Sequence, residues 1–202
     1  LAASDSIDVA AAEDADTIIK EAERTRKIVQ GILNFARKEK IDRTETDINS
    51  LIRDSTAALA GLSSNQGIKI ILDLDESLGH HEVDPGQLRQ VLDNILKNAV
   101  EFMPDGGDIS ICTEEGEESF LMRIEDSGPG IPQDDLSQIF SPFFTTKPAG
   151  KGTGLGLPVC YGIVKMHGGS IQAGNNERGG AFFEIKISHY TREKNLASYI
   201  YS

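Results

Sequence analysis

Residues 84–103 read DPGQLRQVLDNILKNAVEFM, a strongly amphipathic pattern. Its apolar residues recur every three or four positions, which predicts an amphipathic helix (Leu88, Val91, Leu92, Ile95 and Ala99). Asp84 and Pro85 are typical of an N-cap followed by the first helical residue. Asn94 and Asn98 lie four positions apart, so both amides share one side of this helix. They could offer oxygens to Mg²⁺ or donors to phosphates, although a solvated polar face is the commoner explanation for isolated asparagines.

Outward from this helix, strand-like and helical segments follow each other in an order that predicts an α/β sandwich. Asp47 should cap an earlier helix, and a further helix is expected from Leu157 to Met166. Because strand pairs are mixed with helices and do not alternate with them as βαβ units, we expect two layers, a mixed sheet with helices on one face. The strand-like runs are residues 68–75, 108–113, 120–126, 170–175 and 181–187, of which the second and third should form a hairpin.

The segment from about Asp14 to Lys38 predicts one long helix before this sandwich. Its small and apolar residues alternate at spacings of four and three, which is the seam of a helical bundle (Ile18, Ala22, Thr25, Val29, Ile32 and Ala36). Further apolar residues widen that face, which favours a bundle over the alternative of packing on the chain's own domain. A charged linker, residues 37–46, follows the helix.

The bulk composition narrows the classes of function. In 202 residues, 20 basic and 32 acidic side chains give a formal charge of −12, which argues against a nucleic-acid partner. The two cysteines, Cys112 and Cys160, lie far apart and form no disulfide framework, so we expect a cytoplasmic location, even if the full-length protein is membrane-anchored. The chain begins at Leu1 and not at Met, so we expect a piece of a longer protein.

Two glycine-rich stretches are candidates for ligand binding. KGTGLGLP, residues 151–158, precedes a predicted helix, and its glycines could expose backbone N–H groups to an anion, although a tight turn explains it almost as well. It is not a Walker A motif, since Lys151 is not followed by Ser or Thr, and no strand immediately precedes it as in a Rossmann fingerprint. In EDSGPGIP, residues 125–132, Asp126 ends a strand and could accept the exocyclic amine of a purine, or merely cap a turn.

Four motifs follow one another along the chain: Asn-x-x-x-Asn, Asp-x-Gly-x-Gly, FSPFFTTK at residues 140–147, and Gly-x-Gly-x-Gly. Together they closely resemble the N, G1, F and G2 boxes of sensor histidine kinases of two-component systems, in the GHKL superfamily. The resemblance covers residues 47 to about 188, the catalytic and ATP-binding domain. The sequence FFTTKPAGKGTGLGL is most similar to the corresponding segment of sensor kinases of the nitrogen-regulatory type. The resemblance implies a Bergerat-type sandwich that binds ATP and Mg²⁺ between the long helix and a lid at about residues 145–151.

The resemblance also implies roles for individual residues. Asp126 would recognise adenine N6, while Asn98 would bind Mg²⁺ and Asn94 would assist at the phosphates. Because position 101 is Glu, where many relatives carry a base, the lid lysines remain as cationic partners of the phosphates, and Lys147 would act in catalysis with the two asparagines. Phe140, Phe143 and Phe144 would anchor the lid. The other implied cofactor-binding positions are Gly128, Gly130, Ile131, Phe140, Phe144, Thr146, Lys151, Gly152, Thr153, Gly154, Leu155 and Gly156.

The same resemblance separates a kinase from an ATPase. Gyrase-like and mismatch-repair ATPases carry a glutamate general base four residues before the second asparagine, and this chain has Asn94 there, which cannot take a proton. Transfer of the γ-phosphoryl group to a histidine is therefore favoured over hydrolysis, since a neutral imidazole is already a nucleophile. The alternatives are a nucleotide-binding regulatory or dimerisation module without transferase activity and an ATPase of the same superfamily.

Residues 21–40, EAERTRKIVQGILNFARKEK, resemble the second helix of the dimerisation and phosphoacceptor hairpin of this family. The first helix, with its His-Glu-x-x-x-Pro motif, does not precede it, so we infer that the phosphoacceptor was lost by truncation. The expected partners are ATP, a phosphoacceptor histidine helix from elsewhere, a response-regulator receiver domain, and a second copy of the chain through the N-terminal helix. The implied domains are 1–45 (partial dimerisation segment and linker), 46–190 (ATP-binding domain) and 191–202 (tail).

The adjacent histidines of His80-His81-Glu82 are not expected to be catalytic. Pro85 lies four residues after His81, not the five of the phosphoacceptor motif, and Asp84 is better explained as a helix cap. A metal site there is not expected either, because no further cluster of ligands is evident in the sequence.

Overall fold

The computed structural model describes residues 41–63, 67–148 and 152–190, together with a few helical positions nearer the N-terminus (Asp14, Ala15, Ile18, Ile19, Ala22 and Thr25). The rest of the predicted heptad helix lies outside the described residues, as do Lys151 and the predicted tail from residue 191. In the described part of the chain, no helix combines the length and the apolar character that a membrane span requires.

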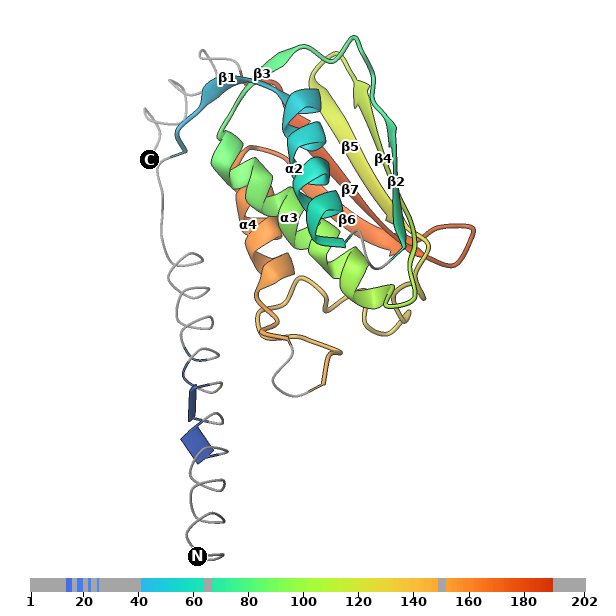
Figure 1. The fold of residues 1–202 in the computed structure, drawn as a ribbon. Helices are drawn as coiled ribbons and strands as arrows, with labels where there is room; N and C mark the ends of the chain where they lie inside the picture. The colour runs from blue at the N-terminus through green and yellow to red at the C-terminus, as the bar shows by residue number, and fades with distance from the viewer. Residues whose placement is uncertain are drawn as a thin grey trace, which may run out of the picture.

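A five-stranded sheet forms one layer of the fold (Figure 1). Its strands are β2 (Ile68–Asp73), β4 (Gly107–Glu115), β5 (Ser119–Asp126), β6 (Ser170–Asn175) and β7 (Ala181–Ser188). Their order in space is β2, β4, β5, β7 and β6. β2 pairs parallel with β4, and the other neighbouring pairs are antiparallel, so the sheet is mixed and the predicted hairpin of β4 and β5 is confirmed.

Three helices, α2 (Ile48–Ser63), α3 (Pro85–Phe102) and α4 (Gly156–Met166), cover one face of this sheet (Figure 1). The apolar residues that the helical period singles out in α3 are all buried, with at most 4% of any side chain exposed. They share one core with inward-facing strand residues, among them Ile111 and Met122, because alternate side chains of a strand point to the same face. The predicted two-layer α/β sandwich is therefore confirmed.

Carboxylate caps begin α2 and α3 at the predicted residues. The Ser50 N–H donates to Asp47 at 2.9 Å, and the Gln87 N–H donates to Asp84 at 3.0 Å. Each cap satisfies an N–H group that has no partner within its helix, a contribution of about 1 kcal/mol. Pro85 follows as the first residue of α3, where an N–H would have had no partner inside the helix.

A second, two-stranded sheet was not predicted. β1 (Thr44–Asp47) and β3 (His80–Val83) pair antiparallel, with Thr46 opposite His81. Both strands have only four residues and are mostly polar, so neither shows the apolar alternation that predicts a strand. The interpretation of residues 37–46 as a linker is therefore corrected for residues 44–46, which form a strand by pairing with a distant segment.

Candidate functional site

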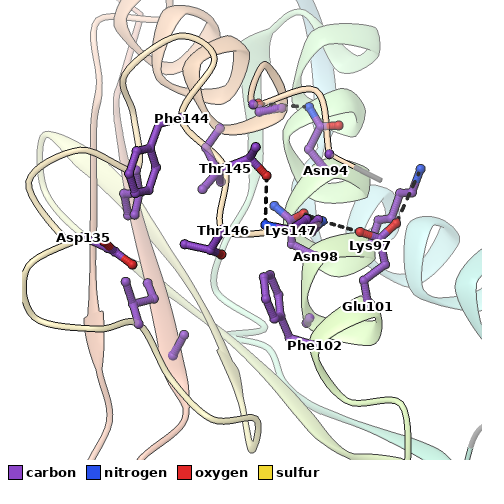
Figure 2. A pocket seen from close by; sticks show the side chains of 18 of the residues that line it. Asn94, Lys97, Asn98, Glu101, Phe102, Asp135, Phe144, Thr145, Thr146 and Lys147 are labelled. Atoms are coloured by element: carbon purple, nitrogen blue, oxygen red, sulfur yellow. Dashed lines mark hydrogen bonds and ion pairs between the residues drawn. The ribbon is translucent and has the colours of Figure 1, made fainter. Parts of the chain in front are cut away.

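A cavity of about 780 Å³ opens between α3, the end of β5 and the loop that leads into α4 (Figure 2). Its volume suits a nucleotide-sized ligand, since small-molecule pockets usually enclose about 300–1,000 Å³. The structure brings most of the predicted site residues together around it: Asn94, Asn98, Asp126, Gly130, Ile131, Phe144, Thr146, Lys147, Gly152, Thr153, Gly154, Leu155 and Gly156.

Three of the predicted positions that the structure describes do not line the cavity. Gly128 lies beside Asp126, and its N–H donates to Oδ1 of that residue at 2.9 Å. Phe140 packs against the core, and its ring centroid lies 5.8 Å from that of Tyr161. Phe143 is 58% exposed. Gly128 therefore contacts a cavity residue from outside the cavity, and neither phenylalanine lines it.

Asp126, at the end of β5, has one carboxylate oxygen fixed by the backbone. The N–H groups of Gly128 and Ala181 donate to Oδ1 at 2.9 and 3.0 Å, and no described residue hydrogen-bonds to Oδ2. Burial raises the pKa of this carboxyl, and the two N–H groups partly offset that rise. One oxygen is thus held in place while the other remains available to accept a hydrogen bond from a ligand.

Two motif glycines are required by the backbone around the cavity. Gly130 has φ +73° and Gly154 has φ +63°, in the left-handed region that favours glycine. A Cβ at Gly130 would clash with the carbonyl oxygen of Gly179, and a Cβ at Gly154 would clash with the backbone of Phe143. Phe143 itself has φ +69°, and its N–H donates to the Gly154 carbonyl at 2.8 Å. The two segments therefore approach too closely for any larger residue at Gly154.

Asn94 connects α3 to the beginning of α4. Its amide Nδ2 donates to the Gly156 carbonyl at 3.3 Å and lies 3.7 Å from Sγ of Cys160. Burial raises the pKa of the Cys160 thiol to about 12, so this side chain packs as a neutral group. Asn94 therefore holds the first turn of α4, which lines the cavity, against the long helix.

A lysine of the loop lies against Asn98 (Figure 2). Lys147 Nζ donates to Oδ1 of Asn98 at 3.0 Å and forms an ion pair with Glu101, three residues further along α3. Lys97 Nζ lies 3.9 Å from the other carboxylate oxygen of Glu101. The oxygen predicted to bind Mg²⁺ thus already contacts a positive charge. Binding of a metal ion at Asn98 requires Lys147 to move.

Several residues of the cavity were not singled out from the sequence as ligand-binding positions. Lys97 and Phe102 share the face of α3 that carries the asparagines, and helical spacing from Asn94 and Asn98 could have identified both. Lys147 Nζ lies 5.2 Å from the centroid of the Phe102 ring. Further cavity residues come from separate parts of the chain, and only the fold brings them to the cavity: Pro129, Asp135, Ile139, Ala181 and Phe183.

Comparisons with known proteins identify relatives of the chain. A family model described as histidine kinase-, DNA gyrase B-, and HSP90-like ATPase matches residues 83–191. The sensor histidine kinase ZraS of Escherichia coli (strain K12) is 34% identical over 171 residues, which are 85% of this chain but only 36% of ZraS. The catalytic domain of the histidine kinase ThkA has a TM-score of 0.67 and 35% identity, over 73% of this chain and 96% of that one. ThkA in complex with the response regulator protein TrrA gives 0.74 and 31%, over 87% of this chain and 50% of that one.

Proposed function

Because the chain belongs to the family of histidine kinase-, DNA gyrase B-, and HSP90-like ATPases and has the fold of histidine kinase catalytic domains, we propose that it transfers the γ-phosphoryl group of ATP to a histidine of another segment or chain. One observation carries the proposal. A nucleotide-sized cavity brings together Asp126, Asn98 and Lys147 from three separate parts of the chain, in the order and spacing of the sensor kinase motifs.

The acceptor histidine has to come from outside the cavity, because none of the four histidines of the chain lines it. His80 and His81 belong to β3, and His189 follows β7. His167 is buried at the end of α4, where its Nε2 accepts the Asp84 N–H at 3.1 Å and therefore serves the fold. This supports a phosphoacceptor helix supplied by a further segment or a second chain.

Three residues would hold the nucleotide for transfer. The free oxygen of Asp126 would accept a hydrogen bond from adenine N6. Oδ1 of Asn98 is an oxygen ligand of the kind that Mg²⁺ prefers, and phosphate oxygens would supply further ligands; the bound ion would neutralise charge on the phosphates. Lys147 would leave Asn98 and Glu101 and contact the phosphates instead.

The carboxylates of the cavity favour transfer over hydrolysis. Asn94 carries no basic oxygen that could deprotonate water, and its amide is occupied with Gly156. Glu101 lies 3.9 Å from Lys97 Nζ and would keep that neighbour when Lys147 moves to the phosphates, while Asp126 is held by backbone N–H groups. Figure 2 shows Asp135 on the side of the cavity away from Asn94. A neutral imidazole needs no such base, so a histidine acceptor fits this site better than water does.

The partners and location of the whole protein follow from the same proposal. A response-regulator receiver domain would take the phosphoryl group from the histidine, as the complex of ThkA with TrrA suggests by similarity. A second copy of the chain would pair through the N-terminal helix. A reducing, cytoplasmic compartment suits the two free thiols, Cys112 and Cys160.

Phosphotransfer in trans tests the proposal. The chain is incubated with γ-labelled Mg·ATP and with separately expressed dimerisation hairpins of ZraS and ThkA as acceptors. We expect label on a hairpin histidine, none on the chain alone, and none with Asn98→Ala. Phosphate release without a hairpin would favour the ATPase alternative. Tight ATP binding without transfer to either hairpin would favour a regulatory module.

A further inference from the structure

Three side chains that commonly bind metals meet at the end of the sheet away from the cavity. They are His81 in β3, Glu115 at the end of β4, and His189 just after β7. The two oxygens of Glu115 lie 2.9 Å from His81 Nε2 and 2.8 Å from His189 Nε2. The two imidazole rings lie side by side, with centroids 4.9 Å apart. One ligand atom from each residue therefore lies within 4.8 Å of the other two.

The fold holds these side chains in place. His81 lies against Phe120, with ring centroids 4.6 Å apart. The His189 N–H donates to the Glu118 carbonyl at 2.8 Å, which continues the pairing of β5 and β7 past the end of β7. The side chains of His81, Glu115 and His189 are 12%, 24% and 30% exposed. The cluster is therefore half-buried and ordered by its strands, yet reachable from solvent.

One nitrogen of the cluster has no hydrogen bond. His189 Nε2 is buried, and although it lies 2.8 Å from Glu115, no described atom is aligned to form a hydrogen bond with it. A buried polar atom without a partner is unfavourable and calls for a missing one. We propose that His81, Glu115 and His189 bind a divalent transition-metal ion of the zinc type.

Two imidazoles and one carboxylate select this class of ion. Zn²⁺ and Co²⁺ accept nitrogen ligands, whereas Mg²⁺ and Ca²⁺ prefer oxygen alone. Bonds of about 2.0–2.2 Å to a tetrahedral ion place ligand atoms about 3.3 Å apart. The three ligand atoms lie within 4.8 Å of one another, so side-chain shifts of at most about 1.5 Å would bring them to that separation. A water molecule would occupy the fourth position, as in other sites with three protein ligands.

Such an ion would join three strands far from the nucleotide. His81 pairs with Thr46 of β1, so the ion would also stabilise the two-stranded sheet of β1 and β3, which residues 41–43 precede. Ile109 of β4 pairs with Asp126 beside the cavity, and Glu115 lies about 20 Å further along that strand. The expected consequence is a more stable domain with no direct contact between the ion and the nucleotide.

Thermal unfolding of the untagged full chain tests the proposal. The protein is treated with a chelator, dialysed, and heated with and without Zn²⁺, in the absence of nucleotide and Mg²⁺. We expect Zn²⁺ at about 100 times its Kd to raise Tm by roughly 5–10 °C. Equilibrium dialysis should find one ion per chain. Co²⁺ in place of Zn²⁺ should give the visible absorption of a four- or five-coordinate site.

The neighbouring histidine provides a matched control. His80 is exposed and adjacent to His81, so His80→Gln should keep the full Zn²⁺ response. His81→Gln, Glu115→Gln and His189→Gln should each weaken Zn²⁺ binding by at least about 100-fold, and their metal-free Tm shows that each one folds. A wild-type chain that binds no Zn²⁺ would overturn the proposal. A response that survives in the three ligand variants, or that His80→Gln abolishes equally, would also overturn it.

Discussion

The two ends of the five-stranded sheet are built in different ways. At the cavity end, the backbone contributes directly: glycines adopt left-handed conformations, and backbone N–H groups hold one oxygen of Asp126. At the opposite end, His81, Glu115 and His189 come from three separate places and contact one another only through their side chains. One end depends on local conformation, and the other depends on how distant strands are paired.

This difference predicts opposite responses to substitution. Burial raises the pKa of Asp126, so the charged form of this carboxyl is unfavourable at the cavity end, as is common at sites that bind ligands. At the opposite end, His81 contacts Glu115 and packs against Phe120, so these contacts contribute to the fold. Changes at the cavity should alter nucleotide binding, and changes at the other end should alter stability with little effect on nucleotide binding.

The largest effect is expected from Asp126→Asn. The amide keeps an oxygen for the N–H groups of Gly128 and Ala181 but places an NH₂ group where a ligand amine would donate. We expect ATP affinity to fall by roughly 10–150-fold, which corresponds to about 1.5–3 kcal/mol for a hydrogen bond to a charged group. Titration calorimetry with Mg·ATP measures the change, and Asp105→Asn on an exposed turn should alter affinity by less than about twofold.

The same substitution should stabilise the chain in the absence of ligand. Because the folded-state pKa of Asp126 is raised, its ionised form is less favourable in the folded chain than in the unfolded one. This loss of stability is present above the raised pKa and disappears when the carboxyl is neutral in both states. In urea unfolding, Asp126→Asn should be more stable than wild type at pH 7, and the gap should close toward about pH 3. A variant less stable than wild type at pH 7 would contradict this account.

Helices and strands could be predicted where their apolar residues repeat over a long enough segment. The 18 residues of α3 show the helical period, and its cap is encoded by Asp84 and Pro85. By contrast, β1 and β3 have four residues each and little apolar alternation. They exist because they pair with each other, and pairing between distant segments leaves no local signal in either of them.

The residues of the candidate site also fall into two groups, those predictable from a local motif and those brought together only by the fold. Gly130 and Gly154 could be predicted because a tight backbone demands glycine within a short motif. The contact of Lys147 with Glu101 could not, since it depends on how the loop folds over α3. The metal-binding side chains next to His81 in the sequence are only its strand neighbours, His80 and Glu82. No metal site was expected there because the sequence shows no further cluster of ligands, and the structure brings Glu115 and His189 to His81 from elsewhere in the chain.

Gly154→Ala should have the next largest effect and tests whether backbone conformation governs the cavity end. The new Cβ would clash with the backbone of Phe143 at a left-handed φ, so the loop must shift. We expect a loss of about 1–2 kcal/mol of stability and roughly tenfold weaker ATP binding. Gly162→Ala adds the same methyl group inside α4, with no atom within 4 Å, and should gain about 0.5–1 kcal/mol. If the two variants behaved alike, backbone conformation at Gly154 would not govern the cavity end.

A smaller change is expected from Glu101→Gln, which tests whether a side-chain contact also matters at this end. The substitution removes the charge that holds Lys147 beside Asn98, so the lysine becomes free to contact phosphates. Glu101 is 39% exposed, so its ion pair is worth about 0.5–1 kcal/mol, and ATP affinity should rise roughly 2–5-fold. Asp93→Asn makes the same change of charge on an exposed face of α3 and should leave affinity unaltered. Weaker binding by Glu101→Gln would instead assign Glu101 to the Mg²⁺ site.

The smallest effect on nucleotide binding is expected from His81→Gln in metal-free buffer. It removes the contact with Glu115 and should lower the free energy of unfolding by up to about 1 kcal/mol. ATP affinity should stay within about twofold, because Glu115 lies about 20 Å along β4 from the pair beside Asp126, beyond the screening length at physiological salt. Measured together, Asp126→Asn should lose affinity and gain stability, while His81→Gln should lose stability and keep affinity. A change in ATP affinity above about fivefold in His81→Gln would show that the sheet couples its two ends, since no direct contact or field would account for it.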